Sequence, residues 1–332
     1  MSKALLELVC PAGTPAALRD AIDAGADVVY VGFRDETNAR NFPGLNFSRP
    51  ELRDGIGYAH QHGREVFVAI NTYAAAGNQA AWHRAIDDAA ALGADAVIIA
   101  DIGLLDYASQ RHPSLRLHLS VQAAASHADA IRFYHEAFGV RRVVLPRVLT
   151  VAEIAKLTRQ IPVETEVFAF GGMCPMAEGR CSLSSYVTGQ SPNRQGVCSP
   201  ASHVRYEQRG DKLVSSLGGS TINIFGKDEK AGYPTLCKGR FAVGDYASYL
   251  FEEPTSLSTG DILKDLAEAG VKALKIEGRQ RGRAYVAEVV RQFRELVDGL
   301  SAGRAMPAAT AALRQLAEGQ QDTFGAYRKA WR

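Results

Sequence analysis

The sequence predicts an α/β fold, a (β/α)8 TIM-like barrel of eight parallel strands with helices around it. A glycine that ends a helical segment is repeatedly followed by a run of β-branched and apolar residues, as at Gly25 and Gly63. Glycine adopts the left-handed conformation that closes a helix, and a continuous apolar run suits a parallel strand covered on both faces. Because eight strands alternate with helices, a closed barrel is favoured over an open doubly wound sheet.

Each element follows from this pattern in chain order. The turn after the first strand, at residues 10–13, lacks the glycine fingerprint of a dinucleotide-binding sheet, which weighs against the open alternative. The expected strands are Leu5–Val9, Asp27–Val31, Glu65–Ile70, Asp95–Ile99, Leu115–Val121, Arg142–Leu145, Val163–Phe170 and Lys272–Ile276. The expected helices are Thr14–Ala24, Arg49–His62, Gln79–Leu92, Gly103–Arg111, Ala128–Phe138, Val151–Arg159, Asp261–Ala269 and Ala284–Leu300.

The domain organisation follows from the gap before the eighth strand. We expect residues 1–300 to form the barrel, and residues 171–259 to be a cysteine-rich insertion between strands seven and eight. Residues 301–332 form a tail, and its alanine-rich helical spacing around Ala308–Leu316 predicts packing on the outside of the barrel or on a partner.

Composition limits the classes of function. The chain has 332 residues, 46% of them hydrophobic and 22% charged, with a formal net charge of +2. This near balance does not suggest a non-specific nucleic-acid binder, so no nucleic-acid partner is expected. The longest apolar runs, such as Ala96–Ala100, are too short to span a membrane. Since no leader precedes the first strand, we expect a cytoplasmic protein whose thiols stay reduced.

Four of the five cysteines are clustered in the insertion: Cys174, Cys181, Cys198 and Cys237. Six, sixteen and thirty-eight residues separate successive members, so only a folded scaffold can gather them. Four thiolates suit a structural zinc or an iron–sulfur cluster. Zinc sites more often use short paired spacings, which favours iron–sulfur, while zinc and unliganded or redox thiols remain open.

Polar residues at the strand ends form the candidate site, because parallel barrels place their sites there. Since the cysteines follow the seventh strand, we expect a cluster that faces the mouth of the barrel. Arginine side chains bind two carboxylate oxygens at once, so the arginines are candidates for holding a small carboxylate. The strand ends supply Cys10, Asn38, Arg40, Asn71, Tyr73, Asp101, Gln122, Arg147, Cys174, Glu277 and Arg279.

The remaining polar candidates each have two interpretations. Asn71 and Gln122 could orient a substrate or cap the next helix. Glu277 could be a general base or the structural partner of Arg279.

Three residues within apolar strands are expected to be structural. Glu7 and Glu166 would be costly to bury without a partner, so we expect each to pair with an Arg or Lys inside the barrel. Cys10 is expected to be a small buried residue rather than a fifth metal ligand.

Several motifs resemble a known family, the collagenase-like peptidases, which includes prephenate-dependent hydroxylases. The resemblance spans essentially the whole chain. It implies a [4Fe-4S] cluster on Cys174, Cys181, Cys198 and Cys237. The motifs include Pro11-Ala-Gly13, Thr37-Asn-Ala-Arg-Asn-Phe42, Val144-Leu-Pro-Arg147, Glu166-Val-Phe-Ala-Phe-Gly171, Ala177-Glu-Gly-Arg-Cys181, Cys198-Ser-Pro-Ala201 and Lys275-Ile-Glu-Gly-Arg279.

The resemblance also implies a reaction and partners. It points to a subunit of an oxygen-independent ubiquinone-biosynthesis hydroxylase that uses prephenate as oxygen donor and a polyprenylated quinone precursor as substrate. A UbiV-like subunit would complete a heterodimer, and a UbiT-like lipid-carrier protein would assist. Relatives that hydroxylate tRNA or ribosomal RNA tend to carry further carboxy-terminal domains, so a chain that ends soon after its barrel favours the quinone branch.

Within this interpretation the strand-end residues receive roles. Asn71, Gln122, Arg147 and Glu277 are the catalytic candidates, and Arg40, Arg147 and Arg279 are the substrate-binding candidates. RNA base hydroxylation and a metal-stabilised, non-catalytic scaffold are the alternatives. A peptidase is disfavoured because the sequence suggests no nucleophile with a base and an orienting acid.

Overall fold

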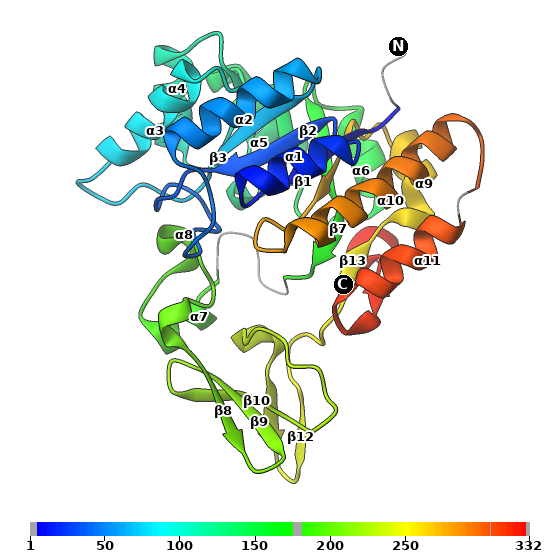
Figure 1. The fold of residues 1–332 in the computed structure, drawn as a ribbon. Helices are drawn as coiled ribbons and strands as arrows, with labels where there is room; N and C mark the ends of the chain where they lie inside the picture. Colours follow the sequence, from blue (N-terminus) through cyan, green and yellow to red (C-terminus); the bar gives the residue numbers. More distant parts are fainter. Residues whose placement is uncertain (1–4, 175–180, 306, 330–332) are drawn as a thin grey trace.

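Eight parallel strands form a closed barrel in the computed structural model, which describes residues 5–174, 181–305 and 307–329 (Figure 1). Each strand pairs with the next along the chain, and β14 closes the barrel because it pairs with both β7 and β1. The expected TIM-like barrel is therefore confirmed. Its strands are β1 Glu7–Pro11, β2 Val28–Gly32, β3 Glu65–Ile70, β4 Ala96–Ile99, β5 Arg116–Leu119, β6 Arg142–Val144, β7 Glu164–Gly172 and β14 Ala273–Ile276.

Five of the eight helices around the barrel, α1, α2, α4, α5 and α6, begin at a side-chain cap. Ser48 and Thr150 each form a capping box with the glutamate three residues later, which satisfies free N–H groups at the helix start. All eight helices expected around the barrel are present within two residues of their expected bounds. They are α1 Pro15–Asp23, α2 Arg49–Gln61, α3 Ala80–Ala91, α4 Ile102–Arg111, α5 Ala128–Phe138, α6 Val151–Thr158, α9 Leu263–Glu268 and α10 Arg283–Ser301.

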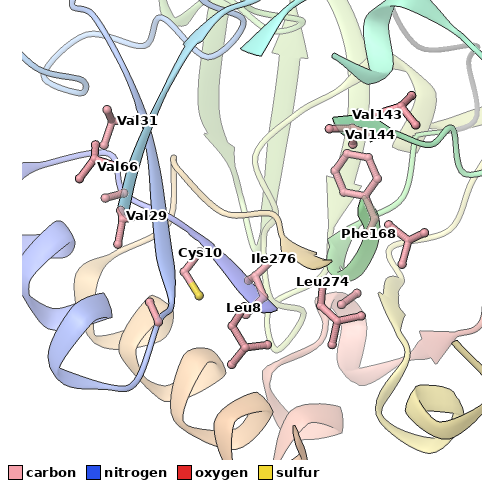
Figure 2. Close-up of a cluster of buried hydrophobic side chains, with 14 of the residues drawn as sticks. Leu8, Cys10, Val29, Val31, Val66, Val143, Val144, Phe168, Leu274 and Ile276 are labelled. Atoms are coloured by element: carbon pink, nitrogen blue, oxygen red, sulfur yellow. The ribbon is translucent and has the colours of Figure 1, made fainter. Parts of the chain in front are cut away.

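The main core lies between the strands and the helices. Successive residues of a strand point to opposite faces, so every second side chain of β1 and β14 packs outward. Figure 2 shows Leu8 and Cys10 of β1 close to Leu274 and Ile276 of β14. Cys10 is fully buried in this core, so the prediction that it is a small structural residue is confirmed.

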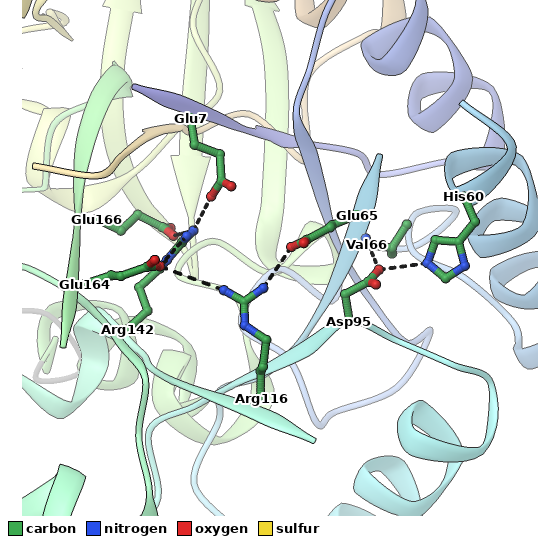
Figure 3. A network of polar contacts seen from close by, with 9 residues as sticks. All are labelled: Glu7, His60, Glu65, Val66, Asp95, Arg116, Arg142, Glu164 and Glu166. Atoms are coloured by element: carbon green, nitrogen blue, oxygen red, sulfur yellow. Dashed lines mark hydrogen bonds and ion pairs between the residues drawn. The ribbon is translucent and has the colours of Figure 1, made fainter. Parts of the chain in front are cut away.

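Charged side chains lie inside the barrel near the amino-terminal ends of the strands (Figure 3), next to a small apolar cluster that includes Val28, Phe67 and Ala96. Arg142 lies 2.5 Å from Glu7 and 3.4 Å from Glu166, and Lys275 Nζ lies 2.7 Å from Glu166. The prediction that Glu7 and Glu166 pair with basic residues inside the barrel is confirmed. These ion pairs join β1, β6, β7 and β14 across the barrel. Pairing of this kind is expected because a buried charge without a partner is costly.

The segment between β7 and β14 contains strands that the sequence analysis did not identify. A three-stranded sheet and a hairpin project from the barrel (Figure 1). β13 then returns to pair antiparallel with the end of β7. The elements are α7 Leu183–Thr188, α8 Pro192–Gln195, β8 Val204–Arg209, β9 Lys212–Leu217, β10 Ser220–Phe225, β11 Arg240–Val243, β12 Tyr246–Tyr249 and β13 Ser256–Ser258.

The tail packs against the barrel. Helix α11, Pro307–Leu316, lies beside α10, and strand β15, Asp322–Thr323, pairs with β13 (Figure 1). The buried Tyr327 hydroxyl donates a hydrogen bond of 2.8 Å to the carbonyl of Phe168 in β7. None of the helices in the described residues is long and apolar enough to cross a membrane.

Candidate functional site at the mouth of the barrel

A cavity of about 270 Å³ lies at the carboxyl ends of the barrel strands. Its lining comes from the strand ends, from the loop after β2 and from the insertion after β7. The ten residues that were given a catalytic, substrate-binding or metal-binding role all line it, although they are spread over most of the chain, whereas the strand-end candidates Cys10, Asn38, Tyr73 and Asp101 do not. The ten residues are Arg40, Asn71, Gln122, Arg147, Cys174, Cys181, Cys198, Cys237, Glu277 and Arg279.

Glu277 lies between two arginines at this cavity. Its Oε1 is 2.5 Å from Arg40 Nη2, and its Oε2 pairs with Arg147. Burial alone would raise the pKa of Glu277, but Arg147 and Arg40 outweigh burial and lower the pKa to about 2. A carboxylate with so low a pKa is a weak general base at neutral pH. The geometry therefore favours the structural role, with Arg40 and Arg147 as the partners in place of the expected Arg279.

Arg279 instead holds the loop after β2. Its Nη1 donates to Asn38 Oδ1 at 2.8 Å, and its Nη2 donates to the carbonyl of Ala39 at 2.6 Å. The side chain needs the space beside Gly32, where a Cβ would stand 2.5 Å from Arg279 Nη1. Burial lowers the pKa of Arg279 to about 10, so the side chain stays cationic at neutral pH.

The loop held by Arg279 carries Arg40 in a strained conformation. The φ angle of Arg40 is 142°, in a region that residues with a Cβ seldom adopt. Asn46 Nδ2 donates to the carbonyl of Arg40 at 2.9 Å, and Asn71 Oδ1 accepts from the N–H of Ala39 at 2.9 Å. Such strain persists only where neighbours fix it, and it is found most often at functional sites.

Neither Asn71 nor Gln122 caps the helix that follows its strand. Asn71 supports the loop before Arg40, and α3 begins only after Gln79. The backbone carbonyl of Gln122 accepts a hydrogen bond of 2.7 Å from the hydroxyl of Tyr73. Both residues line the cavity, so orientation of a substrate remains the prediction for them.

Lys275 is a cavity residue that the sequence analysis did not single out. Its side chain is 8% exposed, and its Nζ lies 3.9 Å from the centre of the Tyr30 ring. Lys275 lies on β14, and Glu277 follows two residues later, just past the end of the strand, so both side chains point to the same side, toward the cavity. A lysine inside an otherwise apolar strand, two residues before a glutamate, was the sequence pattern that could have identified Lys275 as a cavity residue.

The four clustered cysteines are all part of the cavity lining. Cys174 is exposed and the other three are partly buried, and burial raises the pKa of Cys237 to about 11. Residues 175–180 lie outside the described part of the chain. Within the part that is described, no three His, Cys, Asp or Glu side chains are close enough to hold a metal ion. Four thiols around one cavity nevertheless match, in type and number, the donors of a zinc or iron–sulfur site.

A family model described as peptidase family U32 matches residues 13–328, which include the whole cavity lining. The chain belongs to this family. The resemblance to collagenase-like peptidases is thereby confirmed at the level of the family.

Curated relatives of this U32 chain include proteins named for RNA hydroxylation. It is 30% identical over 320 residues to tRNA hydroxylation protein P of Escherichia coli (strain K12), covering 90% of the chain and 69% of the relative. It is 29% identical over 299 residues to tRNA hydroxylation protein P1 of Bacillus subtilis (strain 168), covering 89% of the chain and 64% of the relative. The chain thus spans about two thirds of the length of these relatives.

A third relative is named for ribosomal RNA. The 23S rRNA 5-hydroxycytidine C2501 synthase of Escherichia coli (strain K12) is 29% identical to the chain over 298 residues. The match covers 89% of the chain and 40% of the relative.

The charged residues that line the cavity in this U32 chain are mostly cationic, and two of them, Lys238 and Lys275, pair with Glu318 and Glu166, which do not line it. Among the described residues that line it, five are cationic and one, Glu277, is anionic. Clefts lined by one sign of charge attract ligands of the opposite sign. Apolar side chains, including Ile98, Val144 and Phe168, form much of the remaining wall. An anion with a ring or another apolar part matches this surface. The cationic residues are Arg40, Arg147, Lys238, Lys275 and Arg279.

Proposed function

We propose that this U32 chain is the UbiU-like, iron–sulfur subunit of an oxygen-independent hydroxylase of ubiquinone biosynthesis. The observation that carries the proposal is that four cysteines and the candidate carboxylate-binding arginines line one cavity. The names of the relatives support hydroxylation as the type of reaction. A non-catalytic scaffold is less well supported. Cysteines far from Arg147 and Arg279 would have favoured it, but all of these residues line one cavity.

The cationic cavity supports prephenate, which carries two carboxylates, as the oxygen donor. Arg40 and Arg147 would each bind carboxylate oxygens through their guanidinium groups, in exchange for Glu277. Arg147 Cζ lies 3.6 Å from the centre of the Phe168 ring, a cation–π contact that holds the guanidinium in place before a ligand binds. The apolar wall would exclude water from the reacting group.

The cysteines would hold the cofactor. Cys174, Cys181, Cys198 and Cys237 would bind a [4Fe-4S] cluster, which supplies redox or Lewis-acid chemistry to the cavity when it is bound.

Exposed apolar side chains on the insertion support the proposal that partner proteins cover this part of the chain. Tyr246 is 79% exposed and Val243 is 60% exposed, and both lie on the hairpin β11–β12. Large exposed apolar surfaces commonly mark sites of interaction. The proposed partners are a UbiV-like subunit and a UbiT-like carrier that presents the polyprenylated quinone precursor. Further exposed apolar side chains on the insertion are Tyr206, Ile224, Tyr233, Leu250 and Phe251.

The first experiment concerns the metal. The protein is purified without air, its iron and sulfide are counted, and its electron paramagnetic resonance spectrum is recorded after reduction. About four irons and four sulfides per chain, as a [4Fe-4S] cluster requires, with the signal lost in Cys198→Ala and Cys237→Ala, are expected. Stoichiometric zinc without iron in protein never exposed to air would contradict the proposal. Cys10→Ala is the matched control and should keep the full iron content, because Cys10 is buried in the core.

RNA base hydroxylation is the second candidate, and the names of the relatives favour it. The same anaerobic protein, with its candidate partners and prephenate labelled with ¹⁸O, is offered a polyprenylated phenol or unmodified tRNA. Transfer of label to the phenol is expected. Transfer to tRNA alone would establish the RNA function instead. Affinity for tRNA that falls steeply with salt would accompany that outcome.

A further inference from the structure

Lys275 is a buried amine on the wall of the cavity, deeper in the barrel than Glu277. It pairs in the sheet with Val9 of β1 and Phe168 of β7, one inward-facing position before Glu277. Its side chain is 8% exposed and contributes to the cavity lining. A ligand that enters from the mouth and passes Glu277 therefore meets this amine.

The surroundings of Lys275 are those of an activated amine. Burial lowers its pKa; Glu166 opposes this effect, while Arg279 and Arg142 add to it. A lysine that is desolvated and placed near other cations holds a larger fraction of neutral amine, the nucleophilic form. Lys275 Nζ lies over the face of the Tyr30 ring and donates a hydrogen bond of 2.7 Å to Glu166 Oε1.

Glu166 is suited to move protons for this amine. It is fully buried, and it contacts both Lys275 and Arg142. A carboxylate within hydrogen-bonding distance of the nucleophile can accept its proton and return it later.

We propose that Lys275 forms a reversible imine with a 2-oxo acid bound in the cavity. The amine reacts with a carbonyl group, and Arg40 and Arg147, which line the same cavity and hold the carboxylate of Glu277 between them, can bind a ligand carboxylate in its place. A 2-oxo acid carries both groups on adjacent carbons. The inference rests on the cavity alone, although prephenate, the donor in the proposed function, also contains a 2-oxo acid group.

The reaction balances without an oxidant. The Lys275 ammonium gives a proton to Glu166, and the free amine adds to the carbonyl carbon. The carbonyl oxygen takes a proton from the adding nitrogen and becomes a hydroxyl group. That hydroxyl group leaves as water with the proton from Glu166, and the nitrogen lone pair forms the C=N bond. The products are a protonated imine and one water, and Glu166 is again a carboxylate.

The test uses pyruvate, the smallest stable 2-oxo acid, and the full-length protein as purified. Borohydride reduces an imine to a stable secondary amine, so it fixes pyruvate at the lysine that formed the imine. Mass spectrometry of the intact chain and of its peptides should find one reduced pyruvyl group, on Lys275. Lactate, which has no carbonyl group, should leave no adduct.

Matched variants locate the reaction. Lys275→Arg keeps the charge but cannot form the imine, so its labelling should fall at least tenfold. Lys264→Arg changes a lysine whose side chain is 75% exposed and should label like the wild type. Glu166→Gln should label more slowly while still reacting at Lys275. An unlabelled wild-type chain, or pyruvate spread over surface lysines, would overturn the proposal whether or not the chain hydroxylates anything.

Discussion

Glu277 links pH to stability at the scale of a single residue. Its pKa is about 2 in the folded chain against 4.5 for the unperturbed group, because two arginines favour its charged form. A group with a lowered folded pKa stabilises the fold at pH values above its unfolded pKa. That contribution is lost as the pH falls through about 4.5 toward 2. We therefore expect Glu277→Gln to lower the free energy of unfolding by roughly 3 kcal/mol at pH 7.

The pH dependence separates this effect from a general loss of packing. The difference between wild type and Glu277→Gln in urea unfolding should shrink between pH 5 and about pH 2. Glu268→Gln is the control, because Glu268 pairs with Lys264 on the surface and such pairs contribute about 0–1 kcal/mol. A deficit of Glu277→Gln that is constant with pH would contradict the ion-pair explanation.

The sequence could identify the residues of the site but not their pairing. Arg40, Arg147 and Glu277 were found because they follow predicted strands, and parallel strands end at one mouth of a barrel. Their ion pairs join positions that are 237 and 130 residues apart, which no local pattern encodes. Lys275 was missed because it lies inside a strand, whereas the candidates were chosen only from residues at the ends of strands.

At the scale of the element, the end of β7 packs closely against Glu277, which occupies the space where a side chain at Gly171 would lie. Gly171 has a φ angle of 136°, and a Cβ there would stand 2.7 Å from the Cβ of Glu277. We expect Gly171→Ala to cost about 1–3 kcal/mol in unfolding free energy, because it adds both backbone strain and a clash.

The neighbouring residue supplies the control for this prediction. A Cβ on Gly172 would meet its nearest atom at 3.5 Å, an ordinary contact. Gly172→Ala should therefore unfold within about 0.5 kcal/mol of the wild type. Equal losses in the two variants would show that the end of β7 tolerates no side chain, and would refute the specific contact with Glu277.

Elements were predictable where burial imposes a pattern. The buried strands β2, β3 and β4 read as continuous apolar runs after a helix-closing glycine, and each lies within one residue of its expected bounds. Strand β8 is exposed at most positions, and its sequence Val-Arg-Tyr-Glu-Gln-Arg shows no such run. Its pairing with β9 comes from backbone hydrogen bonds, which leave little trace in side-chain type.

At the scale of the whole molecule, the barrel is closed by charge as well as by apolar packing. Arg142 is 3% exposed and contacts Glu7, Glu164 and Glu166, which lie on β1 and β7 (Figure 3). Arg116 at the same end is 35% exposed and contacts Glu65 at 3.0 Å. The two arginines belong to one network, in which Arg116 also lies 3.8 Å from Glu164, and they differ strongly in burial.

Burial decides what each arginine contributes, because removing one partner of a buried ion pair leaves an uncompensated charge. We expect Arg142→Met to lower the free energy of unfolding by about 3–5 kcal/mol, with little change in added salt. Arg116→Met should cost about 0–1 kcal/mol, and salt should reduce that loss further. Urea unfolding of both variants at low and high ionic strength measures the contrast. Similar losses in the two variants would mean that the barrel is held closed by its apolar layers alone and that the ionic network is incidental to closure.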